Sequence, residues 1–208
     1  YNAFINLERI FYMSNILILA FLFFAGCLIG WGIEVIFRRF EPNNKARKWI
    51  NPGFLIGPYL PLYGFGLCTL YLLAGLEKFI HTDNTALQKF ILFLLMAIAM
   101  TVIELIAGEI FIVKMHVKLW DYTGNKFNYK GIICPLYSLI WAALGAVYYF
   151  FIHPYILDAL NWLANNLAFS FFIGFFYGVF AIDLFYSLKI AEKIKTFAEE
   201  NDMVIRYE

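Results

Sequence analysis

The chain has 208 residues, of which 62% are hydrophobic and 15% are charged, and its formal net charge is +1. An ordinary soluble domain is about half apolar and about a quarter charged, so this composition excludes such a domain and indicates a membrane protein. Nothing in the nearly neutral charge suggests a nucleic-acid partner.

Five apolar runs follow one another along the chain, at residues 14–37, 58–75, 88–113, 132–152 and 167–188. Each approaches or exceeds the roughly 20 residues that a helix needs to cross about 30 Å of hydrocarbon. The runs lack the strict alternation of barrel strands, and a membrane-spanning chain must pair its own backbone groups. The sequence therefore predicts an all-α, polytopic membrane protein of about five transmembrane helices, with residues 1–208 as a single membrane domain.

The first run has no Lys/Arg-rich start and no small-residue cleavage site after it. We therefore expect a retained helix rather than a signal peptide, while a natural start at Met13 would make the preceding residues an extension. Cys27, Cys68 and Cys134 lie in or beside predicted spans without metal-ligand spacing, so we expect them to be buried packing residues.

Basic residues gather in the segments on one side of the predicted spans. Residues 38–52 hold five Lys and Arg, residues 114–130 hold four and the tail at 189–208 holds four, whereas the other side holds three and the segment 153–166 holds none. Because Lys and Arg favour the cytoplasmic side, we expect a multi-pass plasma-membrane protein with its N-terminus outside and its C-terminal tail in the cytoplasm.

Four carboxylates fall within the predicted spans, at Glu34, Glu104, Glu109 and Asp183. An ionised carboxylate in hydrocarbon is costly, so each must be protonated, hydrated, paired or bound to a cation. All but Glu104 lie roughly 6 to 9 Å along the helix from a basic residue of a cytoplasmic segment.

These carboxylates have two interpretations. One is ion pairing at the interface with a basic residue, and the candidates are Arg38, Arg39, Lys114 and Lys189. The other is a shared cavity open to the cytoplasm, above all for Glu34 and Glu109. Glu104 and Glu109 are about 140° apart around a helix, so we do not expect both to face one cavity.

An internal repeat supports the second interpretation. Glu34 precedes Pro61-Leu62-Tyr63 and Glu109 precedes Pro135-Leu136-Tyr137, and the proline lies 27 and 26 positions after the acid, respectively. This spacing predicts two parallel helix hairpins related by an axis along the membrane normal, followed by one further helix. Chance similarity between apolar segments is the alternative.

Two segments beside the spans carry unusual residues. Residues 51–66 contain three Pro and four Gly, which predicts a broken or re-entrant entry to the second span, with an ordinary interfacial loop as the alternative. Residues 120–131 interleave Trp and Tyr with Asp and Asn, for which membrane-interface and turn roles are the simpler explanations. The candidate substrate-binding residues are Glu34, Asn51, Gly53, Tyr63, Glu104, Glu109, Trp120, Asp121, Tyr122, Asn128 and Asp183. Of these we expect Glu34, Tyr63, Glu109, Asp121 and Asn128 to converge on one polar cavity.

Several motifs together resemble a known family. They are Gly-Trp-x-x-Glu at 30–34, Asn-x-Gly-Phe-Leu-x-Gly-Pro at 51–58, Pro-Leu-Tyr-Gly-x-Gly at 61–66, Glu104, Trp-Asp-Tyr at 120–122 and Asn-x-x-Gly-x-Ile at 128–133. This order, from about Gly26 to Gly145, is similar to the bacterial membrane family named putative ABC transporter permease, CmpB type, with departures at Leu60 and Leu62. The resemblance implies a transport role in a bacterial inner membrane. Because this sequence has no Gly-x-x-x-x-Gly-Lys-Ser/Thr segment, a separate ATPase subunit would hydrolyse the ATP.

Three functions stay open at this point. The first is a transporter subunit or small permease with a cytoplasm-facing acidic binding cavity. The second is a membrane-embedded enzyme for a lipid or lipid-linked substrate, with Glu34, Glu109 and Asp121 as acid, base or metal ligands. The third is a non-catalytic partner of another membrane protein. The expected partners are the bilayer and either an ATPase subunit or a second copy of the chain, and no cofactor is predicted.

Overall fold

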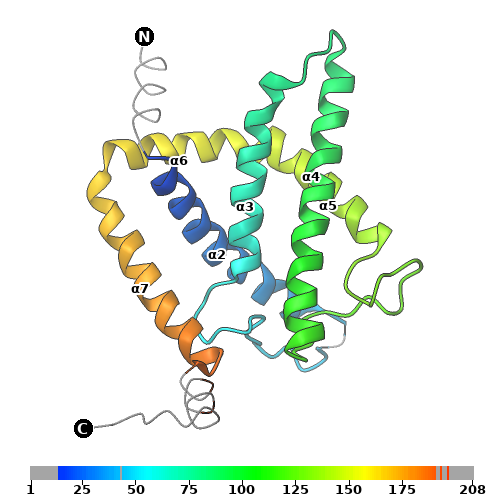
Figure 1. Cartoon of the computed structure of the whole chain (residues 1–208), viewed down its shortest axis with the longest axis vertical. Helices are drawn as coiled ribbons and strands as arrows, with labels where there is room; N and C mark the ends of the chain where they lie inside the picture. The colour runs from blue at the N-terminus through cyan, green and yellow to red at the C-terminus, as the bar shows by residue number, and fades with distance from the viewer. Residues whose placement is uncertain (1–13, 43, 191–192, 194–195, 197–208) are drawn as a thin grey trace.

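The computed structural model describes residues 14–42, 44–190, 193 and 196. In this part of the chain the regular secondary structure is helical, and the loops add one isolated β-bridge between Tyr129 and Ile133 (Figure 1). The α-helices are α2 (Asn15–Phe40), α3 (Pro61–Ala74), α4 (Thr85–Gly108), α5 (Pro135–Val147), α6 (His153–Asn165) and α7 (Ser170–Ser187). Short segments extend or join them: the 3₁₀ turns η1 (Gly75–Phe79) and η4 (Leu167–Phe169), and the π-helical turns η2 (Glu109–Lys114) and η3 (Tyr148–Ile152).

Four helices among the described residues are long and apolar enough to cross a membrane: Asn15–Phe40, Thr85–Lys114, Pro135–Asn165 and Leu167–Ser187. They confirm the prediction of an all-α, multi-pass membrane protein. The second predicted span is shorter as a helix, because α3 begins only at Pro61 and passes into the η1 turn after Ala74. Among the described residues, the second predicted span is therefore the one that does not form a long helix.

Local chemistry explains where these helices begin. Ser14 caps α2 by accepting from the backbone N–H of Ile16 at 3.2 Å, and Asn84 caps α4 in the same way. α3 and α5 each have a proline in the first turn, where the missing N–H costs nothing. The two prolines that carried the predicted repeat, Pro61 and Pro135, therefore hold equivalent places in the fold.

The helices pair as two hairpins, α2 with α3 and α4 with α5, and α3 also packs on α4. Gly26 and Gly30 allow the close approach in the first hairpin. A Cβ at Gly26 would lie 2.8 Å from the carbonyl oxygen of Tyr63, and one at Gly30 would overlap the Tyr63 ring. Small residues at such a spacing let membrane helices pack backbone to backbone, which here positions Tyr63. A superposition of Glu34 on Glu109 stays a prediction.

The segment after the fourth apolar run forms a helix that the hydropathy analysis did not predict. α6 runs across the direction of α3 and α4, beside the start of α2, and leads into α7 (Figure 1). Its Leu160 and Leu163 are fully buried in a cluster with residues of α2 and α7, including Leu22 and Ile173. A helix with one apolar face and one polar face is typical of the membrane interface.

The loop between α2 and α3, the loop after η2 and the end of α7 lie at the same end of the molecule (Figure 1). The predicted cytoplasmic loops therefore share one end, and its assignment to the cytoplasm stays a prediction from charge. Part of the predicted tail, including Lys195 and Arg206, lies outside the described residues. All three cysteines are free thiols, and the predicted burial is confirmed for Cys27 and Cys134, whereas Cys68 is half-buried.

Candidate functional site

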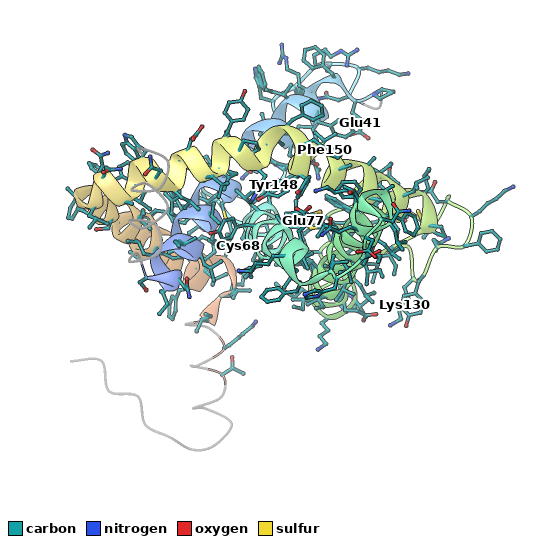
Figure 2. All side chains as sticks on the ribbon, turned by 90° about the horizontal axis from the view of Figure 1, so that it is seen from above. Glu41, Cys68, Glu77, Lys130, Tyr148 and Phe150 are labelled. Carbon is teal, nitrogen blue, oxygen red and sulfur yellow. The ribbon has the colours of Figure 1, made fainter. Side chains whose placement is uncertain are left out.

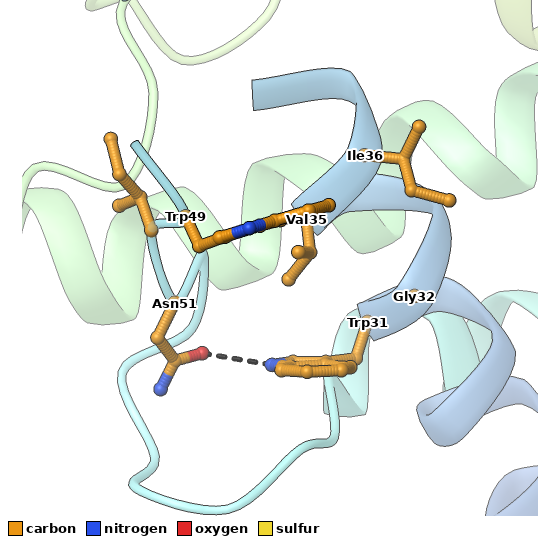
Figure 3. A pocket seen from close by; sticks show the side chains of 7 residues that line it. Trp31, Gly32, Val35, Ile36, Trp49 and Asn51 are labelled. Carbon is orange, nitrogen blue, oxygen red and sulfur yellow. Dashed lines mark hydrogen bonds between the residues drawn. The ribbon is translucent and has the colours of Figure 1, made fainter. Parts of the chain in front are cut away.

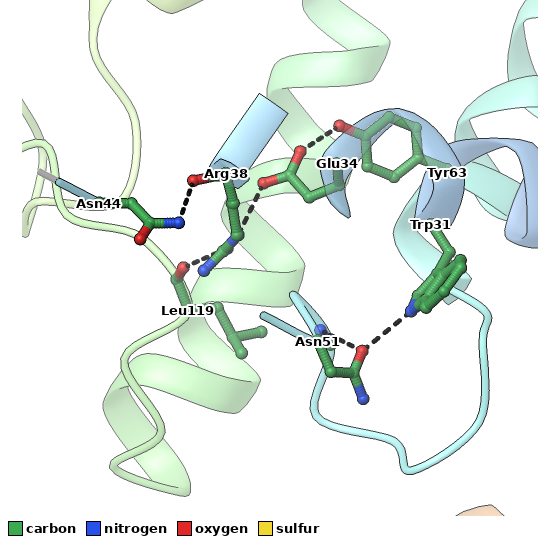
Figure 4. A network of polar contacts seen from close by, with 8 residues as sticks. Trp31, Glu34, Arg38, Asn44, Asn51, Tyr63 and Leu119 are labelled. Atoms are coloured by element: carbon green, nitrogen blue, oxygen red, sulfur yellow. Dashed lines mark hydrogen bonds and ion pairs between the residues drawn. The ribbon is translucent and has the colours of Figure 1, made fainter. Parts of the chain in front are cut away.

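Glu34, on the last turns of α2, lies between a cation and a phenol (Figure 4). Its Oε1 accepts from Nε of Arg38 at 3.1 Å, and its Oε2 accepts from the hydroxyl of Tyr63 at 2.9 Å. Arg38 also donates to the carbonyl of Leu119 at 3.2 Å, so the ion pair ties both basic loops together. Four residues separate Glu34 from Arg38, which places them on one helix face. The predicted ion pair is confirmed for this carboxylate.

Asn51 organises the irregular entry to α3. Its Oδ1 accepts from the indole N–H of Trp31 at 2.9 Å and from the backbone N–H of Gly53 at 3.3 Å. Its Nδ2 donates to the carbonyl of Leu55 at 2.9 Å. The side chain therefore satisfies backbone groups that a helix would have paired. α3 starts only at Pro61, with this proline in its first turn, so a re-entrant entry and an ordinary interfacial loop both stay predictions.

Asp183 fastens this same loop to α7. Its carboxylate accepts from the backbone N–H of Ile56 at 3.2 Å and of Gly57 at 2.8 Å, from the hydroxyl of Tyr59, and from Ser187 at 2.8 Å. Each oxygen thus accepts two hydrogen bonds from the chain itself. Four donors satisfy a carboxylate, so Asp183 acts as a structural clamp in this conformation.

Glu104 has a different environment. It is 4% exposed, and its two oxygens accept from the hydroxyl of Tyr122 at 2.8 Å and from the indole N–H of Trp141 at 3.1 Å. Tyr122 in turn stacks on Tyr137, with ring centroids 4.0 Å apart. None of the ion pairs among the described residues involves Glu104. It is therefore a buried carboxylate held by neutral donors.

Glu109 and Asp121 each lie beside a lysine. Glu109 pairs with Lys130 at 2.6 Å, rather than with the predicted Lys114, and Asp121 pairs with Lys118 at 2.5 Å. The hydrogen bond from Lys118 and then the backbone N–H of Thr123 lower the pKa of Asp121 to about 2. Both carboxylates therefore pair with exposed lysines.

Trp120 and Asn128 shape the loop that carries Asp121. Trp120 donates from its indole N–H to the carbonyl of Ile132 at 2.9 Å. Asn128 donates to the carbonyl of Asn125 at 2.8 Å and accepts from the N–H of Gly131 at 3.0 Å. Gly131 has a φ of 70°, a conformation that glycine adopts without strain. These contacts fold the loop back toward α4, so that Tyr122 reaches Glu104.

The candidate residues fall into several groups. Trp120 and Asp121 line a pocket of about 330 Å³, whereas Asn51 lines a separate pocket of about 440 Å³. Neither lining includes Glu34 or Glu109. Convergence of the predicted set on one cavity therefore stays a prediction. Across the described ranges, no group of three or more His, Cys, Asp or Glu side chains is arranged to hold a metal ion.

Sequence reasoning missed a polar cluster at the opposite end of the molecule, which Figure 2 views from above. Lys89 and the hydroxyl of Tyr149 both donate to the carboxylate of Glu77. The ammonium of Lys89 also lies 4.0 Å from the centre of the Tyr149 ring. Twelve and 72 residues separate the partners of Glu77, so no local spacing in the sequence could have indicated the cluster.

A comparison with family models places these residues in a wider context. The model of the family described as putative ABC-transporter type IV matches residues 21–188, a range that contains every candidate site residue. No curated protein and no solved structure matches the chain. The match spans most of the chain and confirms the resemblance drawn from its motifs. The chain therefore belongs to the family described as putative ABC-transporter type IV.

Proposed function

We propose that the chain is the membrane subunit of a transporter and that Glu104 takes up and releases a proton during transport. Family membership supports a membrane protein of the ABC-transporter type. The observation that carries the finer proposal is the burial of Glu104 among neutral donors, at 4% exposure and without an ion pair among the described residues.

The cost of burying a charge is the physical reason. A carboxylate within a membrane span is stable when it is paired, hydrogen-bonded to saturation or neutralised by a proton. Glu34 has Arg38 and Glu109 has Lys130. Glu104 has two neutral donors, so a bound proton removes most of the remaining cost. Trp141 of α5 donates to Glu104 of α4, so uptake and loss of that proton would change the strength of this hydrogen bond between the two helices.

The depth of Glu104 fits this role. It lies ten residues before Lys114 and 19 after Thr85, or about 15 Å from the basic end of its helix and about 29 Å from the other end. Tyr122 covers it from the loop side and stacks on Tyr137. A displacement of Tyr122 would expose the carboxylate toward the end that we assign to the cytoplasm.

Packing of α3 on α4 brings the helix of Glu104 against the first hairpin. The phenol of Tyr63 on α3 donates to Glu34 at 2.9 Å. The enzyme interpretation relied on Glu34, Glu109 and Asp121, but each of these has its own cationic partner, which favours transport. A separate ATPase subunit as energy source is part of the same proposal.

Infrared spectroscopy of the purified protein in lipid vesicles tests the proton. The wild-type protein should show the carbonyl band of a buried, protonated carboxyl group at neutral pH, and Glu104→Gln should remove it. Glu109→Gln is the matched control and should keep the band, because Glu109 forms an ion pair with Lys130 and is not the buried carboxyl group. A band that survives in Glu104→Gln would refute the assignment.

A flux measurement tests the transport step. Vesicles with a pH-sensitive dye inside, under an imposed inside-negative membrane potential that replaces the ATPase as driving force, should acidify with the wild-type protein and at least tenfold more slowly with Glu104→Gln. Such a loss equals about 1.4 kcal/mol or more in the barrier for proton passage. Equal rates for the wild-type protein, Glu104→Gln and Glu109→Gln would contradict the proposal.

A further inference from the structure

An apolar pocket lies at the basic end of α2, apart from Glu104. Its volume is about 440 Å³, and its walls include Trp31, Gly32, Val35 and Ile36 of α2 with Trp49 and Asn51 of the following loop. In Figure 3 the indoles of Trp31 and Trp49 lie on opposite sides of the opening, with Val35 beside them. Two flat indoles and branched aliphatic side chains make this an apolar slot.

The slot is already formed in the protein. Asn51 holds the Trp31 indole through a hydrogen bond of 2.9 Å (Figure 4), and its amide nitrogen donates to the loop carbonyl of Leu55 at 2.9 Å. The polar atoms of the Asn51 side chain are therefore already hydrogen-bonded within the protein. A Cβ at Gly32 would meet no atom within 4 Å, so this wall opens on free space. A ligand could enter without rearrangement of the backbone.

Two arginines form a basic rim beside the slot. The guanidinium of Arg39 lies over the Trp49 ring, 4.1 Å from its centre. Arg39 donates to the carbonyl of Arg47 at 2.5 Å, and Arg47 donates to that of Arg39 at 3.3 Å. Neither takes part in the ion pairs of the described residues. Both guanidiniums therefore keep N–H donors for an anion.

These features identify the chemistry of the occupant. Trp31 lies seven residues before Arg38, so the slot reaches about 10 Å below the basic turn of α2. With the basic turn at the phosphate level of a bilayer leaflet, the slot would lie at the level of the first part of the acyl chains. Arginine pairs with phosphate through two parallel hydrogen bonds, whereas a cationic headgroup would be repelled by Arg39 and Arg47.

We propose that this slot binds an anionic phospholipid of the adjacent leaflet, with an acyl chain between Trp31 and Trp49 and the phosphate at Arg39 and Arg47. The site is independent of the proton proposed at Glu104. Each arginine near an anionic lipid contributes about 1 kcal/mol, so two arginines predict roughly a 30-fold preference over a zwitterionic lipid.

Tryptophan fluorescence provides the test, because the two indoles line the site. The protein is placed in phosphatidylcholine vesicles that contain a small fraction of phosphatidylglycerol with brominated acyl chains, and bromine quenches tryptophan on contact. The wild-type protein should be quenched at about a 30-fold lower fraction of this lipid than of brominated phosphatidylcholine. Arg39→Gln with Arg47→Gln should abolish the preference.

Two glycine substitutions distinguish a lipid bound in the slot from general attraction of anionic lipid to a basic surface. Gly32→Leu fills the slot and leaves every charge in place, so it should also abolish the preference. Gly178→Leu on α7 is the matched control, because a Cβ there also meets no atom within 4 Å, and it should keep the preference. Equal quenching by both lipids in the wild-type protein, or an unchanged preference in Gly32→Leu, would overturn the proposal.

Discussion

The contact between Gly30 and Tyr63 provides a sharp test of how the first hairpin is held. A Cβ at Gly30 would overlap the ring of Tyr63, so Gly30→Ala must displace that ring and break its hydrogen bond to Glu34. Overpacking of this kind costs about 1 to 3 kcal/mol, and a lost hydrogen bond to a charged group costs about 1.5 to 3 kcal/mol. We expect a loss of about 3 kcal/mol in the free energy of unfolding.

Gly32→Ala is the matched control on the same helix. Its Cβ meets no atom within 4 Å, and alanine stabilises a helix relative to glycine by about 0.5 to 1 kcal/mol. Thermal unfolding in detergent, followed by circular dichroism, should lower the midpoint by about 6 to 12 °C for Gly30→Ala and leave Gly32→Ala unchanged or slightly higher. Equal midpoints for the two variants would show that the close approach at Tyr63 does not hold the hairpin.

Three further outcomes follow from the contacts of single side chains. Asp183→Asn weakens the acceptor that fastens the loop before α3, so limited proteolysis should cut that loop faster while α7 stays intact. Tyr122→Phe leaves one oxygen of Glu104 without its donor and should cost about 1 to 3 kcal/mol of unfolding free energy, which chemical denaturation measures. The pKa of Asp121 falls from 3.8 to about 2, chiefly because Lys118 donates to it, so the ionised form favours the folded loop above pH 3.8. The stabilisation of the loop by ionised Asp121 should be lost as the pH falls from 3.8 toward 2. Tryptophan fluorescence should change over this pH range in the wild-type protein but not in Asp121→Asn.

Hydrophobic composition and local spacing were sufficient for much of the fold. A chain in lipid must pair its backbone locally, so each long apolar run could be assigned as a helix without knowledge of its neighbours. Pro61 and Pro135 marked the starts of two helices for the same local reason, since proline fits the first turn. The pair of Glu34 and Arg38 was also predictable, because four residues along a helix bring two side chains to one face.

Contacts between distant segments required the tertiary structure. Trp141 lies 37 residues from Glu104, and Asp183 binds the N–H of Ile56 across 127 residues. No repeating pattern in the sequence indicates contacts across such separations, because these contacts depend on how the helices pack and where a loop folds back. The position of α6 likewise depends on packing, because its apolar residues are buried by contact with α2 and α7. The sequence by itself determined that the long apolar runs are helices, whereas packing alone decided that Glu104, of the four carboxylates in the predicted spans, is the buried one.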